Sequence, residues 1–183
     1  MRLEDLMTIV PTTTAAALEL FDASEPVEPQ AMLGTWRGAE LPTGHPMDGL
    51  LAASGWWGKQ FVDTETVHPL LFPARDGSSL WPMNPVHAFR GVGLARFPMV
   101  KQRSFATPIA ALSPVVRAHS AKARLRTTRY RGTDTATMLY DQLPINDVFR
   151  RLSDRSVLGA MDMKGSGQPY FFVLSRDDSL PVR

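Results

Sequence analysis

The segment 121–130 alternates between apolar and basic residues, and this alternation constrains the fold more than any other feature of the sequence. Ala123 and Leu125 fall on one side of an extended chain, whereas Arg124 and Arg126 fall on the other. A period of two with one charged side is typical of an antiparallel strand that is buried on one face only. The second half of the chain is therefore expected to form a sheet whose basic side faces solvent.

Further short elements follow this strand. Residues 130–135 predict a turn and residues 136–141 a returning strand. Residues 156–164 and 169–176 predict a closing hairpin, whose turn contains two glycines that can adopt unusual dihedral angles. Between these hairpins, residues 143–152 predict a short helical link.

The first half of the chain mixes helical and extended patterns. Residues 12–22 predict a helix, because threonine suits its N-cap and alanine and leucine favour its interior. Residues 34–41 predict a strand that its glycines allow to bend. Residues 45–55 predict a short helix with a proline in its first turn and a glycine at its end. Residues 56–73 predict two extended segments around a turn.

Many short strands with Gly and Pro turns predict a mainly β fold: an antiparallel barrel with an N-terminal helix and short helical insertions. The length of 183 residues suits an N-terminal helical segment at 1–26 and one barrel domain at 27–183. A barrel of about eight strands can enclose one small ligand. Residues 73–114 show no clear period, and we predict no structure for most of them.

Charge and cysteine content exclude several classes of function. The chain has 20 basic and 18 acidic residues, and the basic ones concentrate at 117–131. This excess is weaker than a nucleic-acid-binding surface usually needs, so we expect no nucleic-acid partner. The absence of cysteine excludes disulfides, thiolate catalysis and cysteine-type zinc sites.

The sequence also predicts the cellular compartment. Residues 1–14 carry an acidic pair where a signal peptide has basic residues. No stretch approaches the ~20 apolar residues of a membrane span. We therefore expect a cytoplasmic protein without a membrane span, and the sequence does not predict its oligomeric state.

The stretch LGTWRGAELPTGHPMDGLL contains an unusual density of special residues. Gly34, Trp36 and Gly38 share one face of the predicted strand, because they lie two positions apart. The simpler interpretation is that Trp36 closes one end of a barrel while the glycines let the strand bend. The alternative is that Trp36 contacts a ligand directly.

Two longer segments resemble a known family pair. Residues 34–72, from GTWRG to HPLLF, resemble the GXWXG protein family, and residues 123–165 resemble the domain of unknown function that usually follows it. The matching positions include Gly34, Trp36, Gly38, Glu40, His45, Asp48, Trp56, Lys59 and His68, and later Arg131, Tyr140, Asp147, Phe149, Gly159, Asp162 and Lys164. The resemblance implies a calycin-like barrel that both segments build together, over about 20–87 and 117–176. It implies no particular reaction.

His45 and Asp48 lie one helical turn apart, so both side chains can share a face. Such a pair can act as an oriented general base or contact a ligand. The alternative is that Asp48 only stabilises the start of the following helix.

Asp162 and Lys164 share one face of a predicted strand, with Met161 and Met163 on the other. If Asp162 and Lys164 point inward, a buried charged pair marks a site. If the methionines point inward, the charged residues form only a surface pair.

Trp56 and Trp57 are neighbours and should lie on opposite faces of the chain. One is expected in the core, and the other can line a pocket or a lid. Lys59 can pair with an anionic ligand head, or it can be an ordinary surface lysine.

Histidine spacing bears on metal and haem binding. No two of the chain's four histidines show the close spacing of metal ligands, so we expect no metal site and no cofactor. Haem is the alternative, with His68 or His87 as axial ligand.

We therefore expect a barrel that binds a small lipophilic molecule in an apolar pocket. The candidate ligand contacts are Trp36, His45, Asp48, Trp56, Trp57, Lys59, His68 and Tyr140. The first alternative is a cofactor-independent isomerase, cyclase or hydratase that acts on such a molecule. Its acid–base candidates are His45, Asp48, Asp162 and Lys164. The second alternative is a purely structural or partner-binding domain.

Overall fold

The computed structural model describes residues 13–90 and 113–183. The first twelve residues, which bear on the expected lack of a signal peptide, lie outside the described residues, as does the stretch 91–112. Within the described residues, no helix is long and apolar enough to cross a membrane.

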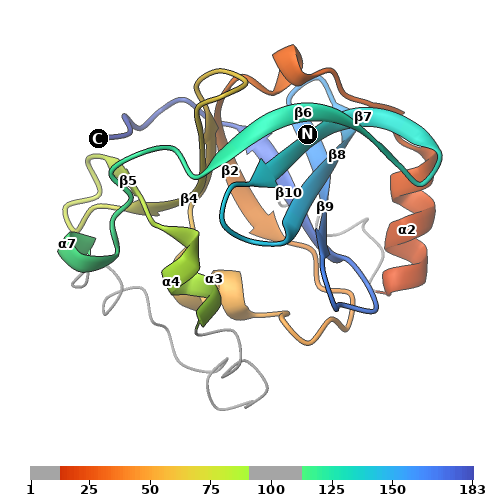
Figure 1. The fold of residues 1–183 in the computed structure, drawn as a ribbon, viewed down its shortest axis with the longest axis horizontal. Helices are drawn as coiled ribbons and strands as arrows, with labels where there is room; N and C mark the ends of the chain where they lie inside the picture. The colour runs from red at the N-terminus through yellow and green to blue at the C-terminus, as the bar shows by residue number, and fades with distance from the viewer. Residues whose placement is uncertain (1–12, 91–112) are drawn as a thin grey trace.

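Eight of the described strands form a closed antiparallel barrel, in which each strand pairs with the next barrel strand along the chain (Figure 1). They are β2 (Gly34–Glu40), β3 (Gly58–Phe61), β4 (Val67–Pro73), β6 (Ala123–Tyr130), β7 (Thr133–Tyr140), β8 (Ile145–Ser153), β9 (Ser156–Met163) and β10 (Tyr170–Arg176). The last strand, β10, returns to pair with β2 and closes the barrel. The short strands β1 (Glu25–Pro26) and β5 (Leu80–Pro82) extend the wall beside β8 and β4. The predicted mainly β, antiparallel barrel is confirmed.

The helical segments within the described residues are short. They are α2 (Thr14–Ala23), the 3-10 helix η1 (Pro29–Met32), α3 (Leu50–Ser54), α4 (Pro85–Arg90) and α7 (Ser113–Val116). The N-terminal helix is confirmed, and Thr13 caps it by accepting a hydrogen bond from the backbone N–H of Ala16. The helix predicted at 45–55 begins later than expected, at Leu50, because Gly49 has a φ of 88° and interrupts the helical path.

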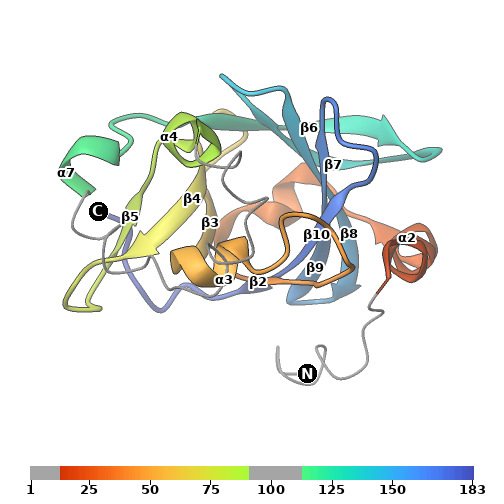
Figure 2. The ribbon, with the colours of Figure 1, turned by 90° about the horizontal axis from the view of Figure 1, so that it is seen from below.

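Helix α2 packs against the outside of the barrel, beside β8, β9 and β10 (Figure 2). Phe21 is fully buried there and makes edge-to-face ring contacts with Phe171 and Tyr130. The Arg131 guanidinium donates two hydrogen bonds to the Asp22 carboxylate, at 2.7 and 2.6 Å. The barrel wall is therefore buried on both faces where α2 covers it.

The helical link predicted at 143–152 is wrong, because this segment forms β8. Ile145 and Phe149 belong to the cluster inside the barrel, whereas Val148 belongs to the outer cluster beneath α2. Since both faces of the strand are buried, its sequence lacks the alternation of polar and apolar residues that identifies a half-buried strand.

Trp36 lies inside the barrel with 2% of its surface exposed. Its indole Nε1 donates a hydrogen bond of 2.7 Å to the backbone carbonyl of Met32, at the end of η1. The Arg176 guanidinium lies 4.7 Å from the centre of the indole ring, in a cation–π arrangement. The residue therefore fixes the strand β2, η1 and the end of β10 to one another.

The basic side of β6 faces solvent, as the alternation predicted. Arg124 lies 3.3 Å from the Asp141 carboxylate, and Arg126 lies 2.7 Å from that of Glu65. We expect the double variant Arg124→Ser/Arg126→Ser to lose less than about 1 kcal/mol of unfolding free energy, because exposed ion pairs contribute little. Urea denaturation measures this change, and the single variant Arg124→Ser is the control.

A much larger loss in the double variant alone would contradict this expectation. It would point instead to the hydrogen bond of 3.1 Å that Arg126 donates to the Thr64 carbonyl, which ties β6 to the turn between β3 and β4.

Candidate functional site

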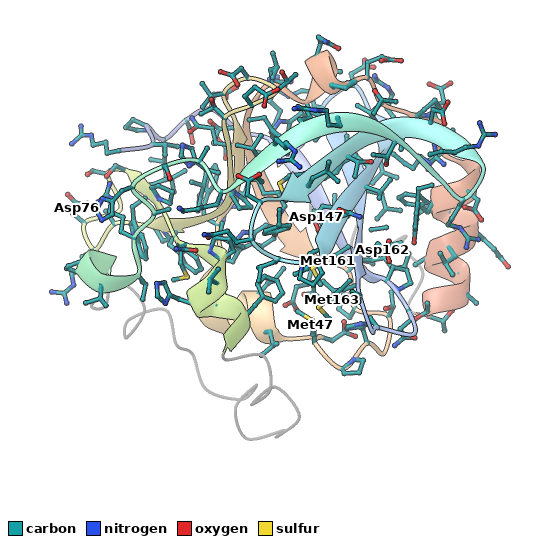
Figure 3. The ribbon with its side chains drawn as sticks, in the orientation of Figure 1. Met47, Asp76, Asp147, Met161, Asp162 and Met163 are labelled. Atoms are coloured by element: carbon teal, nitrogen blue, oxygen red, sulfur yellow. The ribbon has the colours of Figure 1, made fainter. Side chains whose placement is uncertain are left out.

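Lys59 and Asp147 form an ion pair inside the barrel. The Lys59 Nζ atom lies 2.8 Å from Asp147 Oδ2, and the two side chains are 3% and 1% exposed. Lys59 lies on β3 and Asp147 on β8. Three strands separate β3 from β8 in either direction around the barrel, so the two strands lie on opposite sides. The pair therefore crosses the interior, and Figure 3 shows Asp147 among the barrel strands.

The ammonium of Lys59 is surrounded by oxygen atoms and aromatic rings. Besides Asp147, it donates to the Pro69 carbonyl at 3.1 Å and to the Tyr140 hydroxyl at 3.5 Å. Its distances to the ring centres of Phe172, Trp56 and Tyr140 are 5.0, 5.5 and 5.8 Å. Aromatic faces attract a desolvated cation, and they offset part of the loss of hydration that burial imposes.

Two glycines make room for this aromatic shell. A Cβ atom on Gly38 would lie 2.0 Å from the Trp56 ring, and one on Gly159 would lie 2.3 Å from the Phe172 ring. Both distances are far shorter than any real contact, so the two rings lie directly against the backbone of β2 and β9. A larger residue at either position would displace a ring of the site.

Burial changes the acid–base behaviour of the site. It raises the pKa of the Asp147 carboxyl, although the neighbouring Lys59 ammonium and Tyr140 hydroxyl favour the charged form. Burial also raises the pKa of the Tyr140 phenol well above its usual range, and the Asp147 carboxylate adds to that effect. Both groups therefore hold their protons more strongly than they would in water.

The site also contains polar atoms that the described residues do not satisfy. Neither Asp147 Oδ1 nor the indole Nε1 of Trp56 has a hydrogen-bond partner among these residues. An unpaired buried donor or acceptor costs about 1–3 kcal/mol. One acceptor and one donor thus remain available around the Lys59 ammonium.

The two neighbouring tryptophans lie on opposite faces, as predicted. Trp56 belongs to the interior cluster, whereas Trp57 packs outside the barrel with Leu71 and Leu80. Of the sequence candidates, the structure brings together Trp56, Lys59 and Tyr140.

His68 lies on the outer face of β4. It pairs with Gln60, whose neighbour Lys59 points inward, so Gln60 and His68 point away from the interior. The His68 side chain is half-buried, and this burial lowers its pKa below the ordinary value of 6.5.

The lowered pKa of His68 predicts a pH-dependent stability. As pH falls below about 6.5, the unfolded chain takes up a proton before the folded protein does, so folding becomes less favourable. We expect His68→Gln to flatten this loss, as measured by thermal melting across acidic pH. His119→Gln, at an exposed position, is the control, and equal slopes in both variants and the parent would contradict the expectation.

Asp48 organises the loop before α3. Its Oδ2 atom accepts hydrogen bonds from the backbone N–H groups of Thr43, Gly44 and His45, at 3.0, 2.8 and 3.0 Å. One oxygen of this carboxylate is thus occupied by the loop backbone.

His45 is buried, and its ring packs 5.3 Å from that of Tyr170. Its Nδ1 atom accepts a hydrogen bond from the backbone N–H of Met47. Glu40, which the sequence did not single out as a site residue, accepts hydrogen bonds from the backbone N–H groups of Gly49 and Leu51 at the start of α3. The carboxylate that accepts hydrogen bonds from the first N–H groups of α3 is therefore that of Glu40, not that of Asp48.

Asp162 and Lys164 are exposed, whereas Met161 lies in the interior cluster and Met163 packs against it (Figure 3). The sequence allows either Asp162 and Lys164 or Met161 and Met163 to point inward, and the structure has the methionines inward. The structure therefore does not gather the four acid–base candidates, His45, Asp48, Asp162 and Lys164, at one place.

His87 is exposed on α4. Within 13–90 and 113–183, no group of three His, Asp or Glu side chains is arranged to hold a metal ion.

Asp147 and Phe172 are the site residues that sequence reasoning missed. The family resemblance includes Asp147, but a helix over 143–152 does not predict that its side chain points inward. Reading the same segment as a strand places Asp147 on the face of Ile145 and Phe149. A lone acidic residue on an otherwise apolar face is the signal that could have identified it.

Comparison with protein families gives two matches. Residues 19–77 match the family described as GXWXG protein, and residues 121–176 match Domain of unknown function (DUF4334). Lys59 lies in the first segment and Asp147 in the second, so the ion pair joins them. The comparison with curated proteins gave no match.

A solved structure resembles the whole chain. It is described as the crystal structure of a protein from Thermomonospora curvata, is 33% identical, and has a TM-score of 0.69. The similarity covers 96% of each chain. The two segments thus belong together in a relative of the same length.

Proposed function

The chain belongs to the GXWXG protein family, and we propose that its barrel binds a small lipophilic molecule around Lys59 and Asp147. The observation that carries this proposal is a buried ion pair that crosses an aromatic interior beside an unpaired donor and an unpaired acceptor. Sites for lipophilic ligands are mostly apolar and contain a few polar groups that fix the ligand's orientation. The interior of this barrel has that composition.

Half-buried apolar side chains on α3, on α4 and on other segments support the proposal. They pack against the interior cluster and include Leu50, Leu51, Ala88, Phe89, Leu143 and Met163. The Phe89 ring makes an edge-to-face contact with Tyr140, at 6.1 Å between centres. Apolar residues therefore continue from the partly exposed surface to the polar groups of the site, which suits the approach of a lipophilic molecule.

Titration with the uncharged fluorophore N-phenyl-1-naphthylamine tests the proposal. We expect saturable binding of one molecule per chain, with enhanced emission. Native mass spectrometry of the protein purified without denaturant then identifies any molecule that it retains.

Two matched variants locate the bound probe. Ala136 and Ala160 are both fully buried, but Ala136 lies in the interior cluster and Ala160 in the outer cluster under α2. We expect Ala136→Leu to weaken probe binding about tenfold, a loss of about 1.4 kcal/mol of binding free energy, because the larger side chain occupies interior space that the probe would fill. Ala160→Leu should leave binding unchanged, with folding of both variants checked by thermal melting. Unsaturable binding, or equal effects of the two variants, would contradict binding in the interior.

A further inference from the structure

We infer that the site selects an uncharged lipophilic ligand whose polar end is a hydroxyl group, over a carboxylate or an amine of the same length. This inference rests on the proposed function and adds the chemical class of the ligand.

The charge of the site is already balanced. Lys59 and Asp147 are 2.8 Å apart and almost completely buried. A carboxylate that enters beside them adds a second negative charge close to Asp147, and an amine adds a second positive charge close to Lys59. Neither charge finds a free counter-ion there among residues 13–90 and 113–183, and an unpaired charge is costly to bury. An uncharged polar group avoids this penalty.

The hydrogen-bonding groups that remain free match a hydroxyl. The three N–H donors of Lys59 face three oxygens, which belong to Asp147, Pro69 and Tyr140. Among the described residues, Trp56 Nε1 has no acceptor, Asp147 Oδ1 has no donor, and Asp147 Oδ2 faces only the Lys59 ammonium. A hydroxyl both accepts and donates a hydrogen bond, whereas a ketone only accepts one. Of these two groups, only the hydroxyl offers a partner of each kind, an acceptor for Trp56 Nε1 and a donor for the Asp147 carboxylate.

Isothermal titration calorimetry of the unmodified protein with four ten-carbon probes tests the inference: decan-1-ol, decan-2-one, decanoate and decylamine. At neutral pH we expect decan-1-ol to bind about tenfold or more tightly than decanoate or decylamine, since burying an unpaired charge costs well over 1.4 kcal/mol. Decan-2-one should bind about 3- to 10-fold more weakly than the alcohol, because it loses one hydrogen bond.

The neighbouring tryptophans provide a matched pair of variants. Trp56→Phe keeps an aromatic ring in the interior but removes the Nε1 donor, and Trp57→Phe makes the same change on the outer face. We expect Trp56→Phe to weaken decan-1-ol binding about 3- to 10-fold, and Trp57→Phe to leave it unchanged.

The outcomes separate the inference from the proposed function. If neither the fluorophore nor any ten-carbon probe binds, the proposed function fails. If decanoate or decylamine binds as tightly as decan-1-ol, ligand binding stands and the selection of a hydroxyl is overturned. Equal decan-1-ol affinities in the two tryptophan variants would overturn the role of Trp56 in that selection.

Discussion

Asp147→Asn should destabilise the protein by about 3–5 kcal/mol, because it leaves the buried Lys59 ammonium without its counter-ion. In the double variant Lys59→Met/Asp147→Leu both charges are absent, and the space is filled with apolar atoms. Replacing a buried ion pair in this way is often neutral or stabilising. We therefore expect the double variant to regain most or all of the stability that Asp147→Asn loses.

Urea denaturation of the parent, the single variants and the double variant measures this coupling. Asp162→Asn is the matched control, since Asp162 lies exposed on the adjacent strand β9, and it should change stability by less than about 0.5 kcal/mol. If Asp147→Asn is no more destabilising than Asp162→Asn, the ion pair does not form as described.

Trp36→Ala should also cost about 3–5 kcal/mol, as large-to-small changes of buried tryptophan do. The variant loses a ring that is 2% exposed, the hydrogen bond to the Met32 carbonyl and the cation–π contact with Arg176. A loss of this size is a large part of the 5–15 kcal/mol that stabilises a typical domain.

Thermal and urea unfolding of Trp36→Ala tests this expectation, with Arg37→Ala at the exposed neighbouring position as the control. An unchanged unfolding midpoint for Trp36→Ala would show that the residue does not connect η1, β2 and β10 as the structure describes.

The elements that the sequence predicted well have one buried and one exposed face. Ala123 and Leu125 are buried in β6 and Arg124 is exposed, so the alternation is visible in the residue types themselves. The N-terminal helix was found for a similar reason, since its cap and its helix-favouring residues are local signals. Patterns of this kind depend on a few neighbouring residues and need no knowledge of the rest of the fold.

β8 could not be recognised in the same way. The inner face of β8 packs in the interior cluster, and its outer face is covered by α2. The burial pattern of β8 therefore depends on a helix that is far away in the sequence. The helix predicted at 143–152 also gives no indication of the Lys59–Asp147 site. Only the assignment of this segment as a strand shows that the Asp147 side chain points inward. The pairing of Lys59 with Asp147 depends on how the whole barrel closes, which no local pattern records.

The pairing of β2 with β10 has a consequence for the synthesis of the chain. Gly38 pairs with Leu174, which stands 136 positions later. At a translation rate of about 5–20 residues per second, the ribosome needs roughly 7–27 s to make that interval. During this time the edge of β2 that β10 later covers has no partner strand, and such an edge can pair with other chains. Until the final strand emerges, this edge of β2 is therefore a place where two newly made copies of the chain can pair with each other.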